Sequence, residues 1–97
     1  MLKDLDPILH SQLRLGIISV LMVYDEAEFN FLKQKTNTTP GNLSAQISKL
    51  KSEGYIEVEK RFPNNFPQTV CKITPKGIGA FNTYVERLQA YIKPKAE

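Results

Sequence analysis

The chain has 97 residues, of which 41% are hydrophobic, and its formal net charge is +3. This length corresponds to one domain, and no apolar run approaches the length that spans a bilayer, so a membrane protein is not expected. A single cysteine excludes an internal disulfide, and the start Met1-Leu2-Lys3-Asp4 lacks the charged and apolar regions of a signal peptide. Together these features predict a cytoplasmic protein.

The charge is unevenly distributed along the chain. Residues 1–32 carry a net −3, whereas residues 33–61 and residues 62–97 each carry +3. A basic excess that begins in the middle of the chain favours a polyanionic partner. A solvated surface that happens to be basic would have the same charge, so the partner has to be inferred from other features.

The first predicted helix begins at Asp6-Pro7, which reads as an N-cap followed by a proline at the first helical position. Apolar residues then recur at helical spacing as far as about Val23: Leu9, Leu13, Ile17, Ile18, Leu21 and Met22. The stripe is wide, which predicts burial against more than one neighbour. His10 has the chemistry of a ligand or a pH switch, but we expect an ordinary surface or interface histidine.

A short second helix is expected over about residues 29–35, with Leu32 facing the core. Its start is ambiguous, because Asp25 and Glu28 have the spacing of a capping box and would begin the helix earlier. In the turn that follows, Asn37 can adopt a left-handed backbone conformation.

The most informative stretch is a helix predicted over about residues 39–53. Thr39 is suited to the N-cap, Pro40 to the first helical position, and Gly54 to the left-handed residue past the end. An apolar stripe follows one side: Leu43, Ile47 and Leu50. The other side is small, hydrogen-bonding or basic: Gly41, Asn42, Ala45, Ser48, Lys49 and Ser52. A helix that is anchored on one side and polar on the other can enter a DNA major groove.

After Gly54 the apolar period changes to two, which predicts a β-hairpin over about residues 55–74. Ile56 and Val58 would face inward on the first strand, and Cys71 would do so on the second. The position of Cys71 favours a small core residue, and a redox switch is the alternative.

The hairpin loop contains two prolines that stiffen it, an Asn64-Asn65 pair suited to a turn, and the basic pair Lys60 and Arg61 at its base. An ordinary polar hairpin loop is the alternative to a functional one. Two aromatic residues, Phe62 and Phe66, depart from a purely polar tip. They either fold back onto the hairpin or insert at a partner surface, and the sequence does not decide between these.

A long amphipathic helix is predicted over about residues 75–93, with Thr74 as N-cap. Its second half has little of its own domain to cover, so its apolar residues would be exposed without a partner. We therefore expect a homodimer formed through this helix and the first one, with an interface of Leu13, Ile17, Tyr84, Leu88, Tyr91 and Ile92. The alternative is a monomer in which the last helix folds back on the first.

The run Gly41-Asn42-Leu43-Ser44, continued by Ile47, Leu50 and Glu53-Gly54-Tyr55-Ile56, resembles the recognition helix of winged helix-turn-helix regulators. The similarity is greatest to small MarR/ArsR-like regulators and extends from about Leu9 to Tyr84. Ile73-Thr74-Pro75-Lys76-Gly77 is similar to the "L-T-x-x-G" step of MarR-like proteins. The resemblance implies a mainly α fold with a small β-hairpin wing (α+β): a three-helix core, a short strand before the second helix and a long C-terminal helix.

The function implied is that of a sequence-specific, double-stranded DNA-binding transcriptional regulator, expected to be a homodimeric repressor. The helix over 39–53 would read the major groove, and the wing would lie along the backbone or in the minor groove. The residues expected to contact DNA are Thr39, Asn42, Ser44, Gln46, Lys49, Lys60, Arg61, Asn64 and Asn65. Of these, Gln46 lies toward the flank of the apolar stripe, so its exposure is less certain.

No enzymatic activity, cofactor or metal is expected. The chain has no glycine-rich phosphate loop, and a metal site is disfavoured because His10 and Cys71 are single. Glu57 and Glu59 are read as solvated strand charges rather than an acid/base pair. The alternative function is a winged-helix protein-interaction module without specific DNA binding. A small-molecule effector is neither indicated nor excluded.

Overall fold

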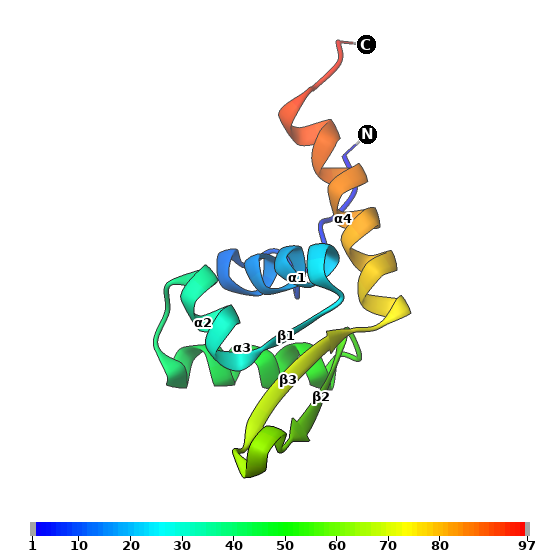
Figure 1. The fold of residues 1–97 in the computed structure, drawn as a ribbon. Helices are drawn as coiled ribbons and strands as arrows, with labels where there is room; N and C mark the ends of the chain where they lie inside the picture. The colour runs from blue at the N-terminus through cyan, green and yellow to red at the C-terminus, as the bar shows by residue number, and fades with distance from the viewer. Residues whose placement is uncertain (1, 97) are drawn as a thin grey trace.

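The computed structural model describes residues 2–96 (Figure 1). Its elements are, in order, α1 (Gln12–Tyr24), β1 (Glu26–Glu28), α2 (Phe29–Thr36), α3 (Pro40–Ser52), β2 (Ile56–Arg61), the short 3₁₀ turn η1 (Pro63–Asn65), β3 (Gln68–Ile73) and α4 (Pro75–Ile92). Four helices with a small β-hairpin confirm the fold class that the sequence predicts. Among residues 2–96, no helix has both the length and the apolar character needed for a membrane crossing.

The sheet is antiparallel and has the strand order β1-β3-β2. Its outer strands both pair with β3: Ala27 lies opposite Cys71, and β2 pairs with β3 from Ile56–Ile73 to Arg61–Gln68. The short strand before α2 is therefore present, as the family resemblance implies. In Figure 1 the hairpin of β2 and β3 extends past α3, and its tip lies beyond the helices.

One hydrophobic core joins α1, α2, α3 and the inner face of the sheet. Nine of its large side chains are completely buried: Leu9, Ile17, Ile18, Leu21, Leu32, Leu43, Leu50, Ile56 and Cys71. Each buried Leu or Ile contributes about 1.5–3 kcal/mol relative to an exposed one. The apolar stripe of α3 is part of this core, so the orientation of α3 about its own axis is fixed by burial.

The local signals that flank α3 and α4 are confirmed. The hydroxyls of Thr39 and Thr74 accept hydrogen bonds from first-turn amides of α3 and α4. Asn37 (φ 50°, ψ 56°) and Gly54 (φ 83°) have left-handed backbones. The second helix begins at Phe29, so the earlier start suggested by the capping-box spacing is not used.

The predicted start of the first helix at Asp6-Pro7 is wrong. Asp6 instead caps a separate turn, in which its carboxylate accepts a hydrogen bond from the amide of Ile8 at 2.8 Å. The helix α1 begins at Gln12, with Ser11 as its N-cap. The physical reason is a tertiary contact, because the other carboxylate oxygen of Asp6 accepts a hydrogen bond from the hydroxyl of Tyr55 and holds the turn against the domain.

Only the first part of α4 packs on the domain, and the rest projects away from it (Figure 1), so the molecule is 61 Å long. Near the start of the helix, Gly77 is buried directly against the backbone of Tyr55. Further along, Tyr84 is buried, and its hydroxyl lies 3.0 Å from Nδ1 of His10. The N-terminal segment therefore covers one side of α4.

The two glycines of α4 provide a matched test of this packing. A Cβ at position 77 would lie 2.3 Å from the carbonyl oxygen of Tyr55, whereas a Cβ at position 79 would meet nothing within 4 Å. We expect Gly77→Ala to lower the free energy of unfolding by about 1–3 kcal/mol. Gly79→Ala should raise it by about 0.5–1 kcal/mol, because alanine is the better helix former. Equal effects of the two substitutions in chemical denaturation would contradict the close packing of α4 on Tyr55.

Candidate nucleic-acid interface

The side of α3 that faces away from the core is polar and uncovered. Its outermost positions are Gly41, Ala45 and Lys49, all exposed. Gly41 and Ala45 have little or no side chain, so they leave the backbone of the helix accessible. A Cβ at position 41 would meet no neighbouring atom within 4 Å. The surface of α3 can therefore approach another surface closely, and the exposed Lys49 adds positive charge in the last turn of the helix.

The flank of α3 nearest to α1 is held by a hydrogen-bond network. The side-chain amide of Asn42 donates to the hydroxyl of Thr38 at 3.1 Å, while the Thr39 hydroxyl accepts from the backbone amide of Asn42. Gln46 is half-buried, and its Oε1 accepts a hydrogen bond of 2.6 Å from the guanidinium of Arg14. The predicted reading residues Asn42 and Gln46 are thus brought together, but Gln46 is less free than Asn42.

The opposite flank of α3 forms one wall of a groove of about 390 Å³ between this helix and the hairpin. Its polar lining consists of Ser44, Ser48, Lys51, Lys60 and Thr69. Nζ of Lys60 donates a hydrogen bond to the hydroxyl of Thr69 at 2.8 Å. Two exposed lysines with hydroxyls between them form a surface that suits an anion such as a phosphate group.

Sequence reasoning missed Lys51 and Thr69 as members of this groove and left Ser48 out of the expected contacts. A signal for two of them was present, because Ser44, Ser48 and Lys51 follow the i, i+4, i+7 spacing of one helix face. For Thr69 the signal is the strand pairing, since this residue lies opposite Lys60 in the register.

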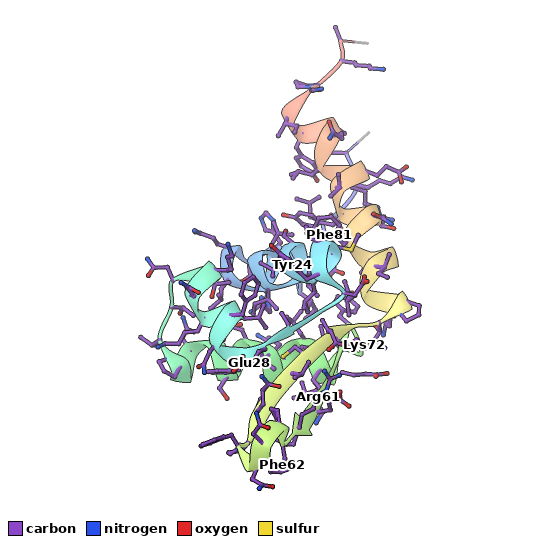
Figure 2. The ribbon with its side chains drawn as sticks, in the orientation of Figure 1. Tyr24, Glu28, Arg61, Phe62, Lys72 and Phe81 are labelled. Atoms are coloured by element: carbon purple, nitrogen blue, oxygen red, sulfur yellow. The ribbon has the colours of Figure 1, made fainter. Side chains whose placement is uncertain are left out.

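Arg61, which Figure 2 labels, lies on the other face of the hairpin from Lys60, because neighbouring residues of a strand point to opposite faces. Its guanidinium forms ion pairs with Glu59 on the same strand and with Glu26 on β1, the latter at 2.6 Å. The hydrogen bond from Arg61 holds the pKa of the Glu26 carboxyl below its usual value. The structure therefore does not bring Arg61 together with the exposed side of α3.

The tip of the hairpin is exposed. Asn64 and Asn65 both have left-handed backbones, with φ of 52° and 64°. The side chains of Phe62 and Phe66 are 66% and 72% exposed, so neither ring folds back onto the hairpin. Of the two alternatives that the sequence leaves open for these rings, the structure excludes the first.

The residues expected at a dimer interface have different environments. Ile17 and Tyr84 are buried within this chain, and Leu13 and Leu88 are half-buried. Tyr91 is exposed, but its hydroxyl donates a hydrogen bond to the backbone carbonyl of Lys3. The exposed apolar side chains of α4 include a stripe with seven-residue spacing: Ile78, Val85 and Ile92. Of these three, the sequence analysis expected only Ile92 at the interface.

Cys71 is buried in the core, and burial raises the pKa of its thiol to about 11. At neutral pH this side chain is almost entirely the unreactive thiol, which is typical of a structural cysteine. Among residues 2–96, no three His, Cys, Asp or Glu side chains are placed to hold a metal ion.

Comparisons with known proteins are consistent with this geometry. A family model described as a winged helix DNA-binding domain matches residues 13–92. An uncharacterized protein of Methanocaldococcus jannaschii is 38% identical over 78 residues, which cover 80% of this chain and 85% of that protein. The family is one of DNA-binding domains and not of enzymes.

Solved structures of transcriptional regulators have a similar fold. A transcriptional regulator homologue from Pyrococcus horikoshii OT3 has a TM-score of 0.83 at 32% identity, covering 88% of this chain and 84% of that one. The transcriptional regulator BldR from Sulfolobus solfataricus has a TM-score of 0.72 at 20% identity, covering 84% of this chain and 58% of BldR. The similarity to BldR is one of fold.

Proposed function

The chain belongs to the winged helix DNA-binding domain family, and on this basis we propose that it is a sequence-specific, homodimeric regulator of transcription. The observation that carries the proposal is the uncovered polar side of α3 beside a groove that contains Lys51 and Lys60. By analogy with the regulators it resembles, the protein would repress transcription by occupying promoters. A regulator of this kind acts where the chromosome lies, which for this protein would be the cytoplasm.

In this proposal α3 enters the major groove of double-stranded DNA. Gly41 and Ala45 allow the helix to approach the bases closely, and Lys49 in the last turn neutralises phosphate charge. Asn42 supplies a side-chain amide, which is the group that pairs with the N6 and N7 positions of adenine. Gln46 is held by Arg14, so its main role in this proposal is to position the side-chain amide of Asn42 and not to read a base. Thr39 would reach the DNA backbone only at the edge of the contact.

The groove between α3 and the hairpin would hold the DNA backbone. Lys51 and Lys60 supply positive charge from two different elements, and Ser44 and Ser48 supply hydrogen-bond donors between them. Such contacts fix the register of the protein on DNA without reading its sequence. Because Arg61 is engaged by two carboxylates on the opposite face, the proposal assigns it to the sheet and not to DNA.

The homodimer would form along α4. Ile78, Val85 and Ile92 lie on one side of this helix at seven-residue spacing, and Phe81 and Leu88 lie between them. This is the pattern of a helix that packs against another helix along a narrow seam. Two protomers joined in this way would present two α3 helices to half-sites about one helical turn, or roughly 34 Å, apart.

The alternative is a winged-helix module that binds protein, and the exposed Phe62 and Phe66 are the observation in its favour. The two functions differ in their salt dependence. DNA binding through Lys51 and Lys60 weakens steeply as salt rises, whereas a contact through two phenylalanine rings does not.

The lysine assignment is tested with the duplex that the wild-type protein enriches most from a random-sequence pool, which we expect to contain a palindrome. Lys51→Gln and Lys60→Gln should each weaken binding and reduce the slope of log K against log salt by about 1. Arg61→Gln is the matched control, and it should leave the slope unchanged because Arg61 is already paired. A slope that falls with Arg61→Gln and not with the lysine variants would refute the assignment. Failure of the wild type to retain any duplex would refute the function.

The dimer is tested by sedimentation of the wild-type protein and two charge variants. Ile92→Glu places a carboxylate in the proposed seam at a position that is 61% exposed, so it should give a monomer without loss of the fold. Ala90→Glu introduces the same charge at an exposed position on the opposite side of α4 from Ile78, Val85 and Ile92, and it should remain a dimer. A monomeric wild type, or a dimer that survives Ile92→Glu, would show that α4 does not join the protomers.

A further inference from the structure

We propose that the tip of the hairpin is an aromatic wedge, which inserts Phe62 and Phe66 against base pairs in the DNA minor groove and bends the duplex. The inference rests on the proposed DNA-binding function and states what this wing contributes to it. It follows from the exposure of the two rings, the rigidity of the turn that carries them, the absence of charge at the tip and the position of the tip relative to α3.

The two rings flank a single short turn at the tip of the hairpin. Phe62 and Phe66 are 66% and 72% exposed, and neither belongs to the hydrophobic core nor packs against it. Each is followed by a proline, and the turn between them is only three residues long. Apolar side chains of this size in contact with water favour burial against another surface.

The turn that carries the rings is rigid. The amide of Asn65 donates a hydrogen bond of 3.2 Å to the carbonyl of Phe62, and the amide of Phe66 donates one of 3.0 Å to the carbonyl of Pro63. Asn64 and Asn65 both occupy the left-handed region, and each proline fixes its own φ angle. The rings therefore lose little backbone freedom when they bind, which is the requirement for a wedge that has to separate stacked bases.

The tip has the chemistry of a minor-groove contact and not that of a phosphate contact. Residues 62–69 contain no charged side chain. Their hydrogen-bonding side chains include the amides of Asn64, Asn65 and Gln68, which can bond to the acceptors that A·T pairs expose in the minor groove. Apolar wedges accompanied by Asn or Gln are the combination that architectural proteins use to unstack a base step in this groove.

The position of the tip fits the same contact. The hairpin runs past α3, and Phe62 lies at its far end (Figure 2), so the tip reaches beyond the surface that would occupy the major groove. The exposed part of α4 lies at the other end of the molecule (Figure 1). A second copy joined along α4 would therefore leave both rings uncovered, and DNA bound by α3 is the surface next to them.

The test compares the wild-type protein with the double variant Phe62→Ala/Phe66→Ala on the duplex most enriched from the random pool. Three quantities are measured: affinity as a function of salt, the bend angle from energy transfer between dyes at the duplex ends, and the permanganate reactivity of thymines. We expect the wild type to bend the duplex by roughly 20° or more and to make thymines reactive at one step per half-site. The double variant should bind about tenfold or more weakly. With this variant the bend of the duplex and the reactivity of its thymines should be lost. The slope of affinity against salt should be unchanged, because no charge is removed.

Two control variants separate the wedge from other effects. Phe62→Leu/Phe66→Leu keeps apolar wedges at both positions and should retain most of the bend. Tyr24→Ala removes an aromatic residue that is 53% exposed at the end of α1, and it should change neither affinity nor bend. Melting temperatures show whether each variant is folded, and the exposure of the substituted rings predicts that all are.

The outcomes distinguish this inference from the function on which it rests. A bend and thymine reactivity that persist in the double alanine variant overturn the wedge, whatever the affinity, and leave DNA binding by α3 intact. If the wild type retains no duplex, the proposed function falls and the wedge falls with it.

Discussion

The burial of one side of α3 is the constraint on which the rest of the structure depends. Leu43 and Leu50 are completely buried and Ile47 nearly so, and together they fix the rotation of the helix about its axis. The Thr39 cap and the left-handed Gly54 fix its two ends. Because the inner side cannot turn outward without losing the core, the polar side must face solvent. The exposure of the side that we propose contacts DNA is therefore a consequence of how the domain is held together.

Because successive side chains of a strand point to opposite faces, the charged residues of the hairpin are divided between its two faces. Lys60 faces the groove beside α3, while its neighbour Arg61 crosses the outer face of the sheet to Glu26. An exposed ion pair of this kind adds little stability, but it joins β1 to β2 across the central strand and neutralises the charge of one arginine. The two faces of the wing therefore have different surroundings, and residues that are adjacent in the sequence need not share a partner.

Much of the fold could be predicted because its signals are local. The capped stripe of α3, the period-two strands and the helix after Thr74 are each contained in a continuous stretch of fewer than twenty residues. The start of α1 could not, since Asp6-Pro7 has the same appearance whether it opens a helix or a single turn. The hydrogen bond between Asp6 and Tyr55, which is far away in the sequence, decides that this segment forms a single turn and not a helix. The candidate site divides in the same way: the exposed polar side of α3 was predictable, whereas the ion pair of Arg61 with Glu26 was not.

The central claim is that DNA meets the outer side of α3, the adjoining groove and the wing, and not the outer face of the sheet. The most direct measurement is a nuclear magnetic resonance titration of the protein with its enriched duplex, following the backbone amides. The account predicts that the largest shifts fall in residues 39–52 and 60–69, with little change at Glu57 and Lys72 on the outer face. Shifts concentrated on that outer face, or confined to α4, would contradict it.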